Sequence, residues 1–259
     1  MCGDCKIKPL LVYHSENPRA FKVYRVNKDI LHVFWRANSK AWVTRHFFVE
    51  WVNQVFGPAV KKYLQERNLP LKCLLCLDNV SAHSPGLEDD IIDQFKFIRV
   101  LYLPPNTTLI RQPMDQQVIS NFKKLYTKHL FKQCFNVTQS TNLTSREFWR
   151  SHFNIVHCLK IMDQAWEGVT RRTLNSAWKK LWLDAVSPRD FEGFGSEPEP
   201  VLAVEEDVEE IVSLGKSMGL EVDEDDITKL VEEHHEELIT EELLEELHAM
   251  QNDEFQAQL

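Results

Sequence analysis

Two short apolar runs stand out in the first half of the chain. Leu71–Leu77 and Phe97–Leu103 each have the length and composition of a buried strand, and each is closed by a turn signal. Between them, Leu87–Phe95 has room for only a brief helix. Strands joined in this way form a βαβ unit, in which the two strands run parallel. The pattern therefore predicts an α/β fold.

A polar segment follows each run. Asp78 comes directly after the first run, whereas the second is followed by a loop at Pro104–Thr108. A helix is expected to restart near Pro113, which places Asp115 in its first turn. Both carboxylates would then lie at the carboxyl-end edge of the sheet, where open α/β folds place their active sites.

Spacing alone leaves two interpretations of Asp78 and Asp115 open. Hard cations such as Mg²⁺ or Mn²⁺ take a few carboxylates and leave their other positions to water and phosphate oxygens, so the pair could form a metal site. Alternatively, Asp78 ends a strand and Asp115 caps a helix, since carboxylates favour helix N-termini for purely local reasons.

More strands and a long helix are predicted in the first 66 residues. Lys8–Ser15 reads as a strand that ends in a proline turn at Glu16–Arg19, and His32–Trp35 is a second short apolar run. Thr44 is expected to cap a helix over Arg45–Glu66, whose apolar residues share one face. The members of that face are Phe47, Phe48, Trp51, Val52, Val55 and Phe56. Such a stripe is typical of a helix that packs on the core.

The second half of the chain is predicted to be helical with interruptions. A helix continues over Asn121–Lys132, after which the polar residues Asn136–Thr144 form a loop. Ser145 then caps another helix, and Asp163–Leu183 adds further helix. These helices are expected to cover the sheet.

Charge is distributed unevenly along the chain. The formal net charge is −9, but residues 197–259 hold 22 acidic and 2 basic residues, whereas residues 1–196 hold 28 basic and 17 acidic residues. A basic body suits binding to the phosphates of nucleic acid, and a solvated basic surface without such a partner is the alternative. No apolar run reaches the roughly 18 residues that a membrane span needs, so no membrane association is expected.

The composition changes near Pro188, where a linker rich in Gly, Ser and Pro leads into an acidic tail. Within the tail, Val204–Leu214 and Leu238–Leu247 keep apolar residues at helical spacing, and Ile227–Val231 does so more weakly. We expect short amphipathic helices on an otherwise extended segment. The tail could fold against a partner, lie on the basic body and compete with nucleic acid, or remain disordered.

Three strings of residues carry a family resemblance: KPLLVYHSENPRAFK at Lys8–Lys22, LDNVSAH at Leu77–His83 and LPPNTTLIRQPMDQQVI at Leu103–Ile119. Over residues 1–190 the chain resembles the DDE domain of the pogo/Tigger/jerky group of transposases. The resemblance implies a ribonuclease H-like fold and a nuclear protein. Members of this group cut and join DNA strands with three acidic residues and two Mg²⁺ or Mn²⁺ ions. The resemblance assigns Asp78 to the second acid and Asp115 to the third.

The first acid of the family motif has no counterpart in this sequence. In the family it lies on the opening central strand, within an Asp-Glu-Thr/Ser-Gly type motif, and this chain contains no Asp-Glu-Thr-Gly string. Residues 1–5 resemble a later hairpin, in which Asp4 aligns with a turn residue. The resemblance therefore implies a ribonuclease H-like DDE domain that lacks its first strands and has little or no nuclease activity.

Further site residues are suggested around the two acids. Arg111, just ahead of Asp115, has a guanidinium fork that matches phosphate oxygens. Asn79 and His83 follow Asp78 and are auxiliary candidates, although His83 could simply fix its own turn. Three lysines could follow a DNA backbone or form the ordinary wet face of an amphipathic helix: Lys123, Lys124 and Lys128.

The sequence divides into a DDE-like domain at 1–190, a linker at 191–200 and an acidic, partly helical or disordered tail at 201–259. It supports three hypotheses about the function of such a protein. The favoured hypothesis is a transposase-derived nuclear protein that binds DNA through its basic body and is catalytically inactive. The second is an active metal-dependent endonuclease that takes its third acid from Glu147, Glu167 or a partner chain. The third is an interaction module whose acidic tail binds protein partners.

Overall fold

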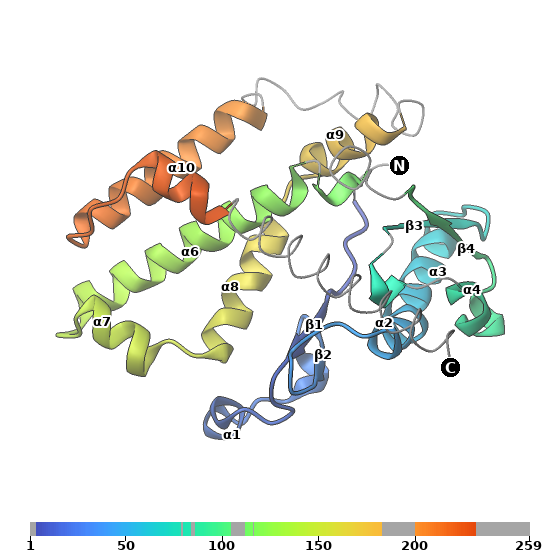
Figure 1. The fold of residues 1–259 in the computed structure, drawn as a ribbon, viewed down its shortest axis with the longest axis horizontal. Coiled ribbons are helices and arrows are strands. Elements are labelled where there is room, and N and C mark those ends of the chain that lie inside the picture. Colours follow the sequence, from blue (N-terminus) through green and yellow to red (C-terminus); the bar gives the residue numbers. More distant parts are fainter. Residues whose placement is uncertain are drawn as a thin grey trace, which may run out of the picture.

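A computed structural model describes residues 4–78, 80–83, 86–104, 112–115, 117–182 and 200–231, and for residues 81, 180 and 200–206 it describes the backbone alone. Figure 1 shows a small α/β part on one side of the molecule and a group of long helices on the other, with a second pair of strands between them. Across the described ranges, no helix has both the length and the apolar character needed to cross a membrane.

The predicted βαβ unit is present. Its strands are β3 (Cys73–Leu77) and β4 (Ile98–Tyr102), which pair in parallel along their full lengths. The connection contains the 3-10 turn η3 (Ser81–His83), the short helix α4 (Leu87–Asp90) and the 3-10 turn η4 (Asp93–Phe95). The pattern of the two apolar runs therefore predicted the strands, the brief helix and the strand direction correctly.

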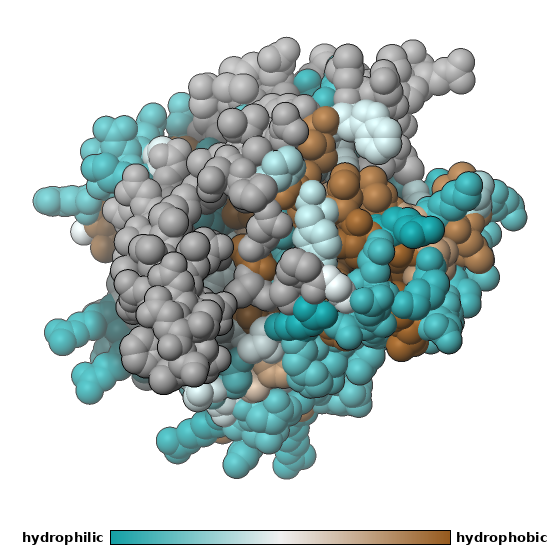
Figure 2. Space-filling view, turned by 45° about the vertical axis from the view of Figure 1, so that its right-hand side comes forward, coloured by the Kyte–Doolittle hydropathy of each residue, from teal (hydrophilic) through white to brown (hydrophobic). Residues whose placement is uncertain are grey.

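The two faces of the β3–β4 sheet have different environments, because successive side chains of a strand point to opposite faces. One face joins the main core cluster, which contains Phe48, Val52, Leu77, Leu87, Ile91, Phe95 and Ile98. The other face carries Leu74 and Leu101, which are 41% and 46% exposed. Figure 2 shows hydrophobic side chains at the surface of this part of the molecule.

A second parallel pair is formed by β1 (Leu10–Tyr13) and β2 (Phe34–Ala37), with helix α1 (Arg19–Tyr24) and the 3-10 turn η1 (Lys28–Ile30) between them. Among the residues that the structure describes, this pair and the β3–β4 pair are separate two-stranded sheets. A mainly hydrophobic groove of about 1090 Å³ extends from Leu10 to β3 and is also lined by later helices.

The predicted helix over Arg45–Glu66 is continuous but changes its winding. It comprises α2 (Arg45–Trp51), a π-helical turn η2 (Val52–Phe56) and α3 (Gly57–Glu66). As expected, Thr44 caps it, accepting from the Phe47 N–H at 3.4 Å.

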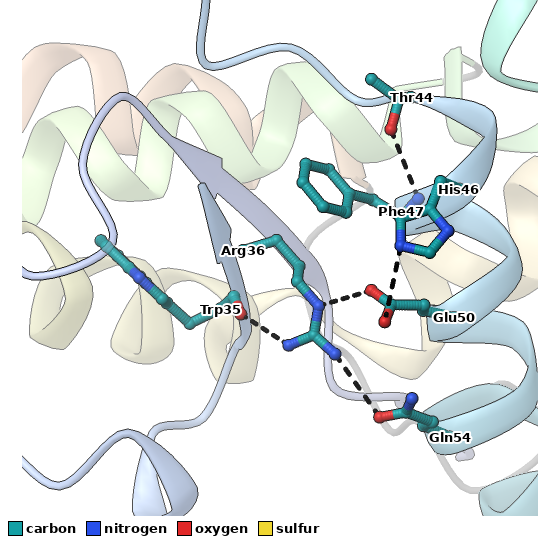
Figure 3. Close-up of polar contacts among 7 residues, drawn as sticks. All are labelled: Trp35, Arg36, Thr44, His46, Phe47, Glu50 and Gln54. Carbon is teal, nitrogen blue, oxygen red and sulfur yellow. Dashed lines mark hydrogen bonds and ion pairs between the residues drawn. The ribbon is translucent and has the colours of Figure 1, made fainter. Parts of the chain in front are cut away.

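Arg36 connects β2 to this helix (Figure 3). Its Nε donates to Glu50 Oε2 at 2.7 Å, and its Nη2 lies 3.5 Å from Gln54 Oε1. A further nitrogen, Nη1, donates to the Trp35 carbonyl at 2.9 Å. Since α2 also places Phe48 in the core beside β3, one helix holds both strand pairs.

The 3-10 turn η5 (Pro113–Asp115) leads into α6 (Val118–Ser140), which is longer than predicted. The expectation of a loop over Asn136–Thr144 was wrong for most of that segment. Thr138 Oγ1 donates to the Phe135 carbonyl at 3.0 Å, and Thr141 Oγ1 donates to the Val137 carbonyl at 2.6 Å. The hydroxyls thus bond back to helix carbonyls, which lets polar residues remain helical.

Among the described residues, the next three helices after α6 do not begin where the sequence predicted. One N-cap is a residue away from the predicted one, and the other two were not predicted. Thr144, rather than Ser145, caps α7 (Ser145–Glu147), which continues as the π-helical turn η6 (Phe148–His152). Asn154 caps α8 (Ile155–Gly168) and Thr170 caps α9 (Arg171–Leu181), so the helix predicted over Asp163–Leu183 is divided.

Part of the acidic tail is folded. Helix α10 (Pro200–Ser217) covers the predicted helical segment Val204–Leu214 and lies alongside α6 in Figure 1. A further helical segment spans residues 224–231. Val208, Ile211, Val212 and Ile227 form a buried cluster with Phe131 of α6 against it. The helix predicted at Leu238–Leu247 lies outside the described residues.

Candidate carboxylate site

Asp78 is held at the end of β3 by the turn that follows it. Leu77 is buried in the core, so Asp78 emerges at the sheet edge with its side chain 13% exposed. His83, on η3, places Nδ1 2.5 Å from Asp78 Oδ1, and its ring centroid lies 4.3 Å from that of Phe48. The histidine thus connects the carboxylate to the core, in agreement with the interpretation that it fixes its own turn.

The Asp78 carboxylate is stabilised in its charged form. Burial by itself would raise the pKa of this group. The hydrogen bond and charge of His83 outweigh that effect, together with the Val80 N–H and the Gln112 side chain, so the pKa of Asp78 lies below its ordinary value. The site therefore contains an ionised carboxylate at neutral pH.

Gln112 brings the second acid to the first. With its carboxamide oriented so that the NH₂ group faces the acids, the nitrogen donates to Asp78 Oδ2 at 3.2 Å and to Asp115 Oδ2 at 3.0 Å. The backbone of η5 supports this arrangement, since the Asp115 N–H donates to the Gln112 carbonyl at 3.1 Å. Because Asp78 Oδ2 and Asp115 Oδ2 contact the same nitrogen, the distance between these two oxygens cannot exceed the sum of their distances to it.

Two carboxylates that face a common point are a suitable partial ligand set for one Mg²⁺ or Mn²⁺, with water completing the shell. In this structure the Gln112 amide lies between them and makes the contacts that a cation would make. Among the described ranges, no group of three or more His, Cys, Asp and Glu side chains could hold a metal. The described donors suit one weakly held cation better than two.

The lysines predicted to contact DNA lie on α6 and take part in intramolecular contacts. Lys123 Nζ donates to the Val231 carbonyl at 2.9 Å. Burial lowers the pKa of Lys123, and the charge of Asp115 opposes that shift, so this lysine lies within electrostatic range of the carboxylate pair. Lys124 is on the same helix, and Lys128 pairs with acidic residues of α10. Asn79 and Arg111 lie outside the described residues.

Glu147, one of the alternative third acids, and Asp4, which was not one, both have structural partners of their own. Glu147 forms a capping box with Thr144, accepting from its N–H at 2.9 Å, and these hydrogen bonds lower the pKa of Glu147. Asp4, which aligns with a turn residue, accepts from the Tyr63 hydroxyl at 2.7 Å and pairs with Arg67. Glu147 therefore stabilises the start of α7, and Asp4 stabilises the contact of the N-terminal segment with Tyr63 and Arg67.

Gln112 was not predicted as a site residue. In the sequence it lies within the string Leu103–Ile119 that carries the family resemblance, three residues before Asp115, but neither position assigned it a role. Its role depends on the return of the chain to Asp78 after β4.

One known protein family matches more than half of this chain. The family described as DDE superfamily endonuclease matches residues 1–178. The chain is 28% identical to the Jerky protein of Mus musculus over 182 residues, which are 70% of this chain and 29% of that protein. It is 25% identical to Tigger transposable element-derived protein 7 of Homo sapiens over 200 residues, 74% of this chain and 36% of that protein.

A third relative is the CENP-B homolog protein 2 of Schizosaccharomyces pombe, 28% identical over 129 residues, 49% of this chain and 23% of that protein. The chain thus spans about a quarter to a third of the length of these relatives. No solved structure gives a significant match. The family match and the relatives agree with the resemblance carried by the sequence motifs, and the chain belongs to the pogo/Tigger/jerky group of the DDE superfamily endonuclease family.

Proposed function

We propose that this protein is a transposase-derived nuclear DNA-binding protein whose ribonuclease H-like DDE site is degenerate and has little or no cleavage activity. One observation carries the proposal: the Asp78–Asp115 pair forms directly before α6, the helix that bears the predicted DNA-contacting lysines. A duplex placed with one phosphate near the carboxylates would run along that helix.

Electrostatics supports DNA as the partner. Residues 1–196 carry an excess of basic residues, and each phosphate that a lysine neutralises releases condensed counterions from the duplex. Arg171 and Lys179 of α9 add basic groups beside α6. The relative named Tigger transposable element-derived protein 7 is in accord with a transposase-derived protein.

The proposed loss of activity follows from the ligand set. Two-metal phosphoryl chemistry needs carboxylates that hold two cations about 3.5–4 Å apart. Mg²⁺ or Mn²⁺ would supply a Lewis acid to a phosphate oxygen, and Asp78 and Asp115 would hold it. The described residues bring no third acid to this pair, and Gln112 and His83 already bind the two carboxylates.

The same proposal includes the domain division. A DDE-like body at 1–190 is supported by the β1–β2 and β3–β4 pairs, between which the groove lies. The linker at 191–200 and the acidic segment at 201–259 complete the chain, and the contact between α10 and α6 supports an acidic segment that acts on the body rather than a wholly free tail.

The test uses the full chain and a fluorescent DNA duplex. Anisotropy at several salt concentrations should show binding that weakens as salt rises, and Lys124→Ala should reduce the slope of log affinity against log salt by about one. Lys62→Ala, an exposed lysine of α3, is the matched control and should leave the slope unchanged. Absence of salt-dependent binding would contradict the DNA-binding proposal.

Cleavage is measured on the same duplex with Mg²⁺ and with Mn²⁺. We expect no cut product above background. Metal-dependent cutting that disappears in both Asp78→Ala and Asp115→Ala would instead establish the active endonuclease, with a third acid supplied by other residues or by a partner chain.

A further inference from the structure

Acidic residues of α10 form ion pairs with Lys128 of α6. Lys128 Nζ lies 2.6 Å from Asp207 Oδ1 and 2.6 Å from Glu210 Oε2. Residues three apart lie on the same face of a helix, so α10 presents both carboxylates to one lysine. The ammonium group of a lysine can bind phosphate oxygens in the same way, as a positive charge with several N–H donors.

This contact is partly shielded from water. The side chains of Lys128 and Asp207 are 23% and 17% exposed. Burial tends to lower the pKa of Lys128, but the hydrogen bonds and charges of Asp207 and Glu210 outweigh it and raise the pKa. The same contact with Lys128 is the main reason why the pKa of Glu210 is lowered. Lys128 and Glu210 therefore each stabilise the charged form of the other.

A second contact lies closer to the carboxylate pair. Lys123 Nζ donates to the carbonyl of Val231, at the end of the helical segment 224–231. Val231 and Ile227 are buried, and Ile227 joins the cluster that packs on Phe131. The segment 200–231 thus covers α6 at both Lys123 and Lys128.

Close packing keeps the two parts of this segment together. A Cβ at Gly215 would lie 2.4 Å from Val222 Cγ2 and 3.4 Å from a Phe131 ring carbon. A side chain at this position would clash with the returning chain, so glycine allows residues after α10 to fold back beside it. The acidic segment therefore packs closely against itself and against α6, and it covers part of that helix.

We propose that the acidic segment 200–231 occupies the surface of α6 to which DNA phosphates would bind, and that it limits DNA binding by competing for Lys123 and Lys128. The inference rests on the proposed DNA-binding function. Its carboxylates occupy the places of phosphate oxygens, and the 22 acidic residues of 197–259 repel an approaching duplex. The apolar cluster keeps the cover in place, while the ion pairs give it specificity for the basic surface.

The main experiment changes charge and leaves the apolar contact intact. Asp207→Asn combined with Glu210→Gln in the full chain should bind a DNA duplex about five- to tenfold more tightly than wild type, because a lysine is released from two charged partners. The slope of log affinity against log salt concentration should become steeper by about one, because one more lysine would release a counterion from the duplex. The control is Glu209→Gln combined with Asp225→Asn, which removes the same charge at two exposed positions and should change affinity less than twofold.

Hydrogen exchange on the wild-type chain gives an independent readout. Addition of duplex should speed amide exchange in 200–231, because DNA displaces the segment from α6. Unchanged or slower exchange there would overturn the inference, whatever the stability of the variants.

The outcomes separate the two proposals. Wild type that binds DNA with the same affinity as both double variants would overturn the competition and leave the proposed function standing. Failure of wild type and of all variants to bind would overturn the proposed function, and the competition with it. Equal tightening in the test and control pairs would reduce the effect to net charge and contradict a contact at Lys128.

Discussion

Asp78 and Asp115 lie on either side of one nitrogen, the side-chain amide of Gln112, at 3.2 and 3.0 Å. An amide in this position reduces the repulsion between two carboxylates without adding charge. It also takes the place where a cation would lie between them. The state of the candidate site is therefore open to test by changing a residue that is not itself an acid.

Replacement of Gln112 by glutamate should strengthen metal binding. A third carboxylate would meet the first two, and three hard oxygen ligands hold Mn²⁺ better than two. We expect the Kd for Mn²⁺ to fall at least about tenfold, with a lower melting temperature in metal-free buffer from like-charge repulsion. Calorimetric titration and thermal melts with and without Mn²⁺ provide the measurement. Gln65→Glu, exposed on α3, should change neither quantity.

Removal of the His83 ring should destabilise the fold. The His83→Ala variant leaves the partly buried Asp78 carboxylate without its imidazole partner and removes a ring from beside Phe48. An unsatisfied buried group costs about 1–3 kcal/mol, and that loss is expected in the free energy of unfolding by urea at neutral pH. The exposed His46 serves as the control. A cost for His83→Ala no larger than for His46→Ala would show that the Asp78 carboxylate does not depend on the His83 imidazole.

Acid should weaken the contact between α10 and α6. The pKa of Glu210 is lowered from 4.5, mainly by its hydrogen bond to Lys128. A carboxyl group whose pKa is lower in the folded than in the unfolded chain stabilises the fold fully at pH values above its unfolded pKa. This stabilisation is lost as the pH falls through the folded pKa. The difference in melting temperature between wild type and Glu210→Gln should therefore be full at pH 7, begin to shrink near pH 4.5 and vanish once the pH lies below the lowered pKa of Glu210 in the folded chain. A difference that persists at low pH, or one equally large in Glu209→Gln, would exclude this origin.

The open face of the β3–β4 sheet should promote self-association. In the described part of the chain β3 pairs only with β4, and Leu74 and Leu101 are exposed on the same face. Unpaired strand edges and exposed apolar side chains attract other chains. Leu74→Lys should shift the protein toward monomer in sedimentation experiments at high concentration. Leu69→Lys, an equally exposed leucine outside the strand, should do so less.

Local patterns were sufficient for the elements around the site. The two apolar runs predicted β3 and β4, the short segment between them predicted a brief helix, and their order predicted a parallel pair. Thr44 was recognisable as a cap because its hydroxyl acts on a neighbouring N–H. Signals within a few residues decide such features, so they can be read from sequence.

Other features depended on contacts between distant segments. No local sequence pattern indicates that the chain after β4 places Gln112 beside Asp78. The length of α6 depends partly on hydroxyl groups that bond back to helix carbonyls. Sequence patterns left the lysines of α6 open to two interpretations, and their partners on the acidic segment could not be chosen from sequence. Lys128 meets Asp207 and Glu210 only because Phe131 packs on the cluster of Val208 and Ile211.

The sequence by itself determined the strand order of the βαβ unit, the placement of Asp78 and Asp115 after its strands, the family resemblance and the separation of a basic body from an acidic tail. Only the tertiary structure decided which groups these charges meet. Charge, periodicity and turn chemistry are properties of short segments, whereas pairing between residues far apart in sequence is set by the packing of whole helices. That packing places the acidic α10 on the basic α6.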